Sequence, residues 1–317
     1  MTRRIRTAMK MGANGRLWTW LGRGSVARLA RVPTLRNSVW FQERAKAFLR
    51  LGYWPNLARP STLAEKLLWL KLHYMHPLHA RLTDKLAVRS YVEEHAPEIR
   101  LPRLLWNGDD PTALPWAAIP RPSVLKPNHA SGYVAFLSRD ADDAHVLDMA
   151  ARWLLVRYQD KGAGRHYEGI PPRLLVEEFL GTVGADGSLV PPADFKVLVA
   201  NGRALCVQHF TGRFQQTVRR MYDTQWNLLP ITRHGGDGKP PEELHDDVPR
   251  PSCLANMVSA AERLAAPFPF VRVDFYVVHD APYFSEMTFI PSNGHIPIMP
   301  RSWDRTLGAQ LALPAVG

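Results

Sequence analysis

Two carboxylates near the end of the chain are spaced so that they could hold a metal ion together. They lie in the segment 271–289, which reads as a β-hairpin of two apolar strands. Side chains alternate across a strand, so Arg272 and Asp274 share one face of the first strand, and Glu286 and Thr288 share a face of the second. If these faces coincide, the carboxylates repel unless a cation or a proton lies between them. Mg²⁺ meets that need, because it binds one or two carboxylates together with nucleotide phosphates. A solvent-facing hairpin with an Arg–Asp pair is the alternative.

A lysine followed by small residues could bind phosphate. Lys126 stands at the entrance of the loop 127–133, which contains Asn128, Ser131 and Gly132 and is flanked by predicted strands. Backbone N–H groups in such a turn can point at phosphate oxygens, and the lysine adds a point charge. A strand rather than a helix follows, so the loop is not a Walker A sequence. An ordinary hairpin loop is the alternative.

Two further strands carry charged side chains among apolar ones. Glu177 and Glu178 are adjacent on an apolar strand and therefore point to opposite faces, so that one faces a ligand and the other faces solvent. On a later strand, Asp194 and Lys196 share a face while apolar residues pack below them. For Lys196 the alternative is a solvated strand lysine.

Three arginines could recognise an anionic substrate. Arg213, Arg219 and Arg220 lie between these strands and the last predicted helix. A fork of guanidinium groups suits a carboxylate or a phosphate, so we expect at least one of the three to bind substrate. A basic loop on the surface is the alternative.

The composition indicates a globular protein with a basic N-terminal segment. Hydrophobic residues make up 46% of the 317 residues, which is ordinary for a globular protein. The two cysteines, Cys206 and Cys253, are far apart in the sequence. Their spacing argues against a disulfide framework or a zinc site and fits a reducing cytoplasm. No run is apolar enough to cross a membrane, and no signal peptide is evident. Residues 1–50 hold 12 of the 40 Lys and Arg but one of the 29 acidic residues, which accounts for the whole net charge of +11. Nucleic acid is therefore not the expected partner of the whole protein. Residues 1–50 are a partly disordered tail or a short amphipathic helix on an anionic membrane surface.

Periodicity and turn signals predict the elements that must position these residues. Helices are expected at 62–74, where Thr62 and Glu65 form a capping box, and at 84–95, 143–158 and 252–265. Strands are expected at 101–106, 123–126, 134–138, 173–179, 195–200, 204–209, 271–278 and 283–289. The last two pairs of strands should form hairpins that turn at Asn201-Gly202 and at Asp280-Ala281.

In chain order, these features resemble the ATP-grasp superfamily. More narrowly, the sequence is similar to the TupA-like ATP-grasp family, which is associated with bacterial surface polysaccharide and teichuronopeptide biosynthesis. The stretches that carry the resemblance are TDKLAVRSYV at 83–92, VLKPNH at 124–129, DFK at 194–196, YDTQWN at 222–227, PFVRVDF at 269–275 and EMTF at 286–289. The resemblance runs from about Gly52 to Leu313.

The resemblance implies an α+β ATP-grasp fold that holds the nucleotide between two β-sheet lobes, with a mostly helical N-terminal region. The implied domains are the basic extension 1–50, a helical lobe with a short strand at 51–120, and the ATP-grasp domain 121–317. Within the last, 121–180 would form the lid and nucleotide lobe, and 181–317 would form the metal-binding lobe.

The resemblance also assigns roles to the site residues. ATP phosphates would meet Lys126, Lys196 and the loop residues Asn128, Ser131 and Gly132, while adenine or ribose would meet Glu177, Glu178 and Phe179. Mg²⁺ would be held by Asp274 and Glu286, and Arg272 would steady the reacting phosphoryl group or acyl phosphate. Thr288 occupies a position where the superfamily usually has asparagine, so Asn293 or water could take its place.

The implied reaction has two steps. A substrate carboxylate attacks the γ-phosphate of ATP and gives an acyl phosphate and ADP, and an amine then displaces phosphate to form an amide. The alternatives are a kinase that phosphorylates a sugar or related hydroxyl, a sugar-nucleotide glycosyltransferase of polysaccharide biosynthesis, and a non-catalytic nucleotide-binding adaptor. We expect the ligase to be cytoplasmic, with residues 1–50 able to meet the inner face of the membrane.

Overall fold

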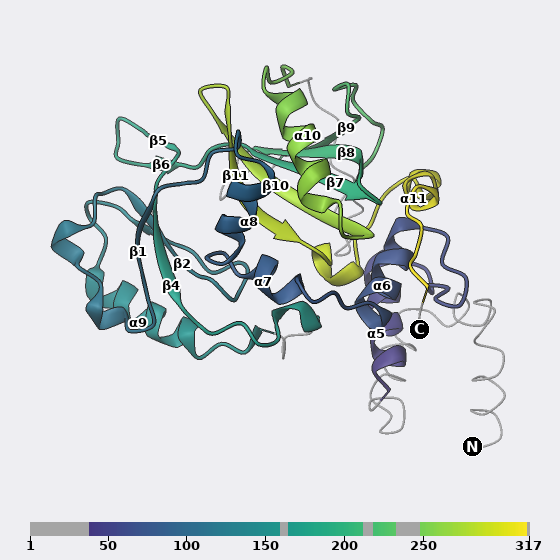
Figure 1. Ribbon diagram of the computed structural model, residues 1–317, viewed down its shortest axis with the longest axis horizontal. Coiled ribbons are helices and arrows are strands. Elements are labelled where there is room, and N and C mark those ends of the chain that lie inside the picture. The colour runs from purple at the N-terminus through teal and green to yellow at the C-terminus, as the bar shows by residue number, and fades with distance from the viewer. Residues whose placement is uncertain (1–37, 159–163, 212–217, 233–247, 316–317) are drawn as a thin grey trace. The chain divides into compact units, whose positions relative to one another are not determined.

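The computed structural model of the chain describes residues 38–158, 164–211, 218–232 and 248–315 (Figure 1). The chain divides into two compact units. The larger consists of Met75–Leu229 and Asp247–Phe289, and the smaller of Met1–Tyr74, Pro230–Asp246 and Ile290–Gly317. Most of the predicted basic extension, together with Arg213, lies outside the described residues.

The larger unit contains three antiparallel sheets. The first has four strands in the order β1-β4-β2-β3, the second five in the order β11-β10-β7-β8-β9, and the third two, β5-β6. The strands of the first sheet are β1 (Leu104–Gly108), β2 (Ser123–Pro127), β3 (Ala135–Leu137) and β4 (Leu174–Glu178). Those of the second are β7 (Asp194–Ala200), β8 (Arg203–Thr211), β9 (Val218–Tyr222), β10 (Phe270–Val278) and β11 (Ala281–Thr288), and the short pair is β5 (Thr182–Val183) and β6 (Leu189–Val190). Every predicted strand is confirmed to within a few residues.

Amphipathic helices pack against the two larger sheets. Helix α10 (Leu254–Ala265) lies across β7 and β10, and its buried stripe includes Leu254, Met257, Ala261 and Leu264 (Figure 1). Helix α9 (Asp143–Leu154) packs on the four-stranded sheet through Val146, Ala150 and Trp153. Burial of these apolar stripes fixes each sheet as a rigid base for the polar residues on its other face.

The region before β1 departs from the prediction of one helix from Asp84 to His95. It forms the short helix α7 (His79–Thr83) and then α8 (Val88–His95). The Asp84 carboxylate accepts the backbone N–H groups of Leu86 and Ala87, at 2.8 and 3.3 Å, and so closes the turn between the helices rather than capping the second. The prediction was wrong because an Asx turn and an N-cap have the same sequence signal.

Two hairpins of the five-stranded sheet have turns with positive φ. Asn201 (φ 48°) and Gly202 (φ 74°) join β7 to β8, as predicted. His279 (φ 49°) and Asp280 (φ 57°) join β10 to β11, one residue earlier than the predicted Asp280-Ala281. A bulge between Asp274 and Phe275 then shifts the register by one residue, which places Arg272 opposite Thr288 and Asp274 opposite Glu286. The two polar faces therefore coincide, an outcome that the alternation alone had left open.

The smaller unit is mainly helical. It contains α5 (Val39–Leu51), α6 (Leu63–His73), the short helix η6 (Pro291–Gly294) and α11 (Arg301–Ala309). The predicted capping box is present: Thr62 Oγ1 accepts the Glu65 N–H at 3.1 Å, and the Glu65 carboxylate accepts the Thr62 N–H at 3.2 Å. Helix α5 was not anticipated at the end of the basic segment; Ser38 caps its first turn and Gly52, in the left-handed region, ends it.

Close packing in this unit depends on a glycine. A Cβ at Gly308 would lie 2.6 Å from backbone atoms of Ser61, Thr62 and Leu63 at the start of α6, so only glycine lets α11 approach α6 there. Among the described helices of both units, none is both long and apolar enough to span a membrane.

Candidate functional site

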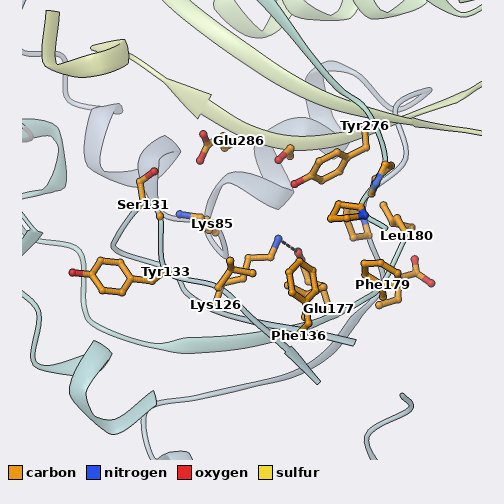
Figure 2. A pocket seen from close by; sticks show the side chains of 18 of the residues that line it. Lys85, Lys126, Ser131, Tyr133, Phe136, Glu177, Phe179, Leu180, Tyr276 and Glu286 are labelled. Carbon is orange, nitrogen blue, oxygen red and sulfur yellow. Dashed lines mark ion pairs between the residues drawn. The ribbon is translucent and has the colours of Figure 1, made fainter. Parts of the chain in front are cut away.

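A cavity in the larger unit is lined by residues of both large sheets. From the four-stranded sheet and its loops come Val124, Lys126, Ser131, Gly132, Tyr133, Phe136, Glu177 and Glu178, and from the five-stranded sheet come Lys196, Tyr276, Ser285 and Glu286 (Figure 2). The cavity therefore gathers half of the site residues that the sequence singled out, although they are spread over more than 150 positions of the chain.

The first charged group, which we call the Lys126 cluster, consists of Arg89, Lys126 and Glu177. Lys126 Nζ lies 2.5 Å from one oxygen of Glu177 (Figure 2). Arg89 donates to the other oxygen at 3.0 Å. Burial lowers the pKa of Lys126, but the combined attraction of Glu177, Tyr276 and Glu286 outweighs it and raises the pKa above its usual value. Lys126 is therefore charged at neutral pH. Glu177 lines the cavity and binds two cations, and the contact with adenine or ribose that we expected of it stays a prediction.

A third lysine belongs to this side of the cavity and was missed. Lys85 lines the cavity, its Nζ donates to the Ala130 carbonyl at 2.7 Å, and its backbone N–H donates to the Asn128 carbonyl at 3.3 Å. Burial lowers its pKa. Lys85 lies within the stretch 83–92, one of those that carry the family resemblance. This position was the sign in the sequence that could have identified Lys85 as a site residue.

The loop after Lys126 has a fixed base and an accessible tip. Asn128 is fully buried; its amide donates to the Pro171 carbonyl at 3.1 Å and accepts the Arg173 N–H at 2.7 Å. It does not line the cavity, so the predicted nucleotide contact of its side chain is not supported. Ser131 and Gly132 do line it, and Gly132 (φ 83°) has open space around it.

One end of the cavity is apolar. Phe136, Phe179 and Leu180 line it, and the rings of Phe136 and Phe179 meet edge to face with centroids 5.7 Å apart (Figure 2). Glu178, which directly precedes Phe179, also lines the cavity and accepts the Arg103 N–H at 2.8 Å. A flat heteroaromatic base fits such a surface, with polar groups at its edge.

The second charged group, which we call the Asp274 cluster, consists of Lys196, Arg272, Asp274, Glu286 and Thr288. Arg272 binds both Asp274 oxygens, at 2.6 and 2.7 Å, and also reaches Glu286 Oε1 at 3.2 Å and Thr288 Oγ1 at 3.1 Å. Lys196, which pairs with Asp274 in the register of β7 and β10, donates to the same carboxylate. Asp274 is fully buried, and burial raises its pKa against the pull of Arg272 and Lys196.

The Asp274 cluster suits a divalent cation in the type of its ligands. The described residues contain no group of three or more His, Cys, Asp or Glu arranged around a metal position. Instead, two opposed carboxylates and a hydroxyl surround one guanidinium, which supplies the cation that their repulsion required. Glu286 lines the cavity, so an ion that arrives with phosphates could be held by Glu286 and Asp274 if Lys196 and Arg272 gave up part of their contact with Asp274.

Among the described residues, the arginines predicted to bind substrate do not lie at the cavity. Arg219 and Arg220 lie on β9 and do not line the cavity; the Arg219 guanidinium covers the Phe210 ring at 5.1 Å, and Arg220 is buried. Burial, with a smaller effect of Arg220, lowers the pKa of His209 to about 4. Asn293 belongs to the smaller unit, in η6, with φ 57°.

Comparison with known proteins identifies the class. The profile of the family described as TupA-like ATPgrasp matches residues 65–312, and the chain therefore belongs to this family. No curated protein matches the sequence. Membership confirms the predicted ATP-grasp fold.

Solved structures show weaker likeness. D-alanine–D-alanine ligase from Bacillus anthracis, complexed with ATP, has 15% identity and a TM-score of 0.45 over 73% of this chain and 65% of that chain. The ATP-grasp ligase PsnB, complexed with a minimal precursor, Mg and ADP, has 14% identity and a TM-score of 0.39 over 92% and 75%. L-amino acid ligase from Bacillus licheniformis has 11% identity and a TM-score of 0.42 over 73% and 49%. The chain thus spans just under two thirds of the length of the D-alanine–D-alanine ligase.

Proposed function

We propose that the protein is an ATP- and Mg²⁺-dependent carboxylate–amine ligase that acts through an acyl phosphate. One observation carries the proposal: a single cavity is lined by apolar side chains at one end, by three lysines, and by Glu286, which pairs in the strand register with the buried Asp274. These are the surfaces that the base, the phosphates and the metal ion of a nucleotide require.

The residues would divide the work of the first step. Lys126, Lys85 and the loop tip at Ser131 and Gly132 would hold the phosphates, and Lys196 and Arg272 would offset the charge that grows on the transferred oxygens. Asp274 and Glu286 would hold Mg²⁺, which would neutralise phosphate charge. Positioning of a substrate carboxylate against the γ-phosphate supplies the rest, and no covalent enzyme intermediate is needed.

We propose that the product is an amide on a cell-surface polysaccharide or glycopeptide precursor. Support comes from the family to which the chain belongs, since the resemblance that the sequence shows to this family is what implies a role in surface polysaccharide biosynthesis. A kinase with the same ATP site is the main rival, and a glycosyltransferase is the other.

The test is product analysis with purified protein, ATP, Mg²⁺ and pooled uronic acids and amino acids. A ligase releases ADP and free phosphate only when both an acid and an amine are present. ADP without free phosphate would favour a kinase, and no consumption of ATP in any pool would count against both.

We also propose that residues 1–50 attach the enzyme to the inner face of the membrane. The segment carries all the net charge, and Val39 (65% exposed) and Trp40 (44% exposed) present apolar surface at the start of α5. Each Lys or Arg near an anionic leaflet contributes about 1 kcal/mol before screening.

Sedimentation with anionic and neutral vesicles tests this attachment on the full chain and on a chain that starts at Ser38, which keeps α5 intact. Binding should require anionic lipid, fall with salt and weaken strongly on truncation; equal sedimentation of both chains would contradict it.

A further inference from the structure

Arg89 stands behind the cavity and contacts two of the residues that line it, Glu177 and Pro102. It lies in the first turn of α8, and its side chain is 18% exposed. One terminal nitrogen donates to Glu177 Oε1 at 3.0 Å and the other to the Pro102 carbonyl at 2.8 Å. The guanidinium is thus held at two points, and it does not line the cavity.

Glu177 consequently bridges two cations. Its second oxygen lies 2.5 Å from Lys126 Nζ, and the Glu177 side chain is only 8% exposed. Two cations share one carboxylate, so the Lys126 cluster has a net charge of +1. Without the guanidinium, Lys126 and Glu177 would form a neutral buried pair, and the lysine would have little charge left for an incoming anion.

We infer that Arg89 is a positioning residue for the polyphosphate of the nucleotide, which it never touches. By taking up part of the charge of Glu177 and fixing the orientation of its carboxylate, Arg89 leaves the Lys126 ammonium free to exchange Glu177 for phosphate oxygens. This inference rests on the proposed function, because it takes a nucleotide polyphosphate as the ligand of Lys126.

The planar fork explains why arginine occupies the position. Its two terminal nitrogens reach a carboxylate and a carbonyl at the same time, which a single ammonium cannot do with the same geometry. Arg89→Lys should therefore weaken nucleotide binding, because it no longer fixes the orientation of the Glu177 carboxylate. The loss should be smaller than in Arg89→Met, because the lysine keeps the positive charge.

A double-mutant cycle tests the inference by calorimetry of ADP binding. Arg89→Met should weaken ADP binding about tenfold, the lower end of what a charge-assisted hydrogen bond contributes. Glu177→Gln should bind ADP at least as tightly as the unaltered protein, because Lys126 is released. In the Glu177→Gln background, Arg89→Met should then have little effect. Arg81→Met, which removes an exposed arginine bonded to Ser90, is the matched control and should change nothing.

Each result has a distinct meaning. An equal loss from Arg89→Met in both backgrounds would overturn the inference, because Arg89 would then act on the nucleotide or on the fold and not through Glu177. Unchanged ADP binding in Arg89→Met would overturn it as well. If Arg89→Met does not fold, as judged by its melting temperature, Arg89→Lys replaces it in the double-mutant cycle with Glu177→Gln. Absence of ADP binding to the unaltered protein would instead sink the proposed function.

Discussion

Two lysines face one cavity from different sheets, and the carboxylates that hold them are balanced differently. Lys126 shares Glu177 with Arg89, which gives two cations for one anion. In the Asp274 cluster, Lys196 and Arg272 are matched by Asp274 and Glu286, which gives two cations for two anions. The first cluster has an excess of positive charge and attracts phosphate, whereas the second is balanced and contains the opposed carboxylates that suit a metal ion.

The two clusters also differ in burial. The Asp274 side chain is 1% exposed, whereas that of Glu177 is 8% exposed, and the Lys126 and Arg89 side chains are 17% and 18% exposed. A buried charge that loses its partner costs far more than a partly solvated one. Substitutions in the Asp274 cluster should therefore have the larger effects on both turnover and stability.

The largest effect is expected for the carboxylates of the Asp274 cluster. Asp274→Asn and Glu286→Gln should each abolish Mg²⁺-dependent ATP turnover while the protein stays folded. Asp274→Asn should also lower the free energy of unfolding by about 3–5 kcal/mol, because it leaves two buried cations without their charged partner. Turnover assays and thermal unfolding measure the two effects. Turnover within a few-fold of the unaltered protein in both variants would remove the metal assignment.

A smaller effect is expected for the lysines. Lys126→Met and Lys196→Met should each weaken ATP binding by roughly 1.5–3 kcal/mol, the range for charge-assisted hydrogen bonds. The loss for Lys126 should be present without metal, whereas the loss for Lys196 should be greater with Mg²⁺, because Asp274 holds Lys196 until a metal ion replaces it. Calorimetry with and without Mg²⁺ separates the two. If both variants bind ATP as the unaltered protein does, the phosphates lie elsewhere.

The smallest effect concerns the metal ion alone. Without nucleotide, Lys196 and Arg272 already neutralise Asp274, so Mn²⁺ used as a probe should bind weakly. Removal of one nearby cation in Lys196→Met should tighten Mn²⁺ binding by about tenfold or more. Lys126→Met is the matched control in the other cluster and should have a much smaller effect. A titration in which both variants bind Mn²⁺ equally would show that phosphate binding and metal binding are not separated between the two clusters.

The two polar faces of the final hairpin coincide through a bulge between Asp274 and Phe275, which was not predicted. The alternation within each strand could be predicted because it depends on local rules. The period of two put Arg272 and Asp274 on one face of β10, and Glu286 and Thr288 on one face of β11. The capping box of α6 and the Asn201-Gly202 turn were predictable for the same reason, since their determinants lie within a few residues.

The partners of the charged residues could not be predicted, because they depend on packing between distant segments. Arg89 and Glu177 are 88 positions apart, and Lys196 and Asp274 are 78 apart. Asn128 looked like a loop residue available to phosphate, yet the backbone around Arg173 takes up its amide. Glu177 likewise looked free on an apolar strand, and its two cations come from α8 and β2.

The central claim is that the enzyme activates a carboxylate by phosphorylating it. The direct measurement uses a carboxylic acid that supports phosphate release in the product analysis. The acid is labelled with a heavy oxygen isotope in its carboxylate and is given to the protein together with ATP, Mg²⁺ and the amine. Because the carboxylate oxygen attacks the γ-phosphate and leaves with it when the amine displaces phosphate, the account predicts one heavy oxygen in each released phosphate. Release of unlabelled phosphate during formation of the product would contradict the acyl phosphate and with it the proposed ligase.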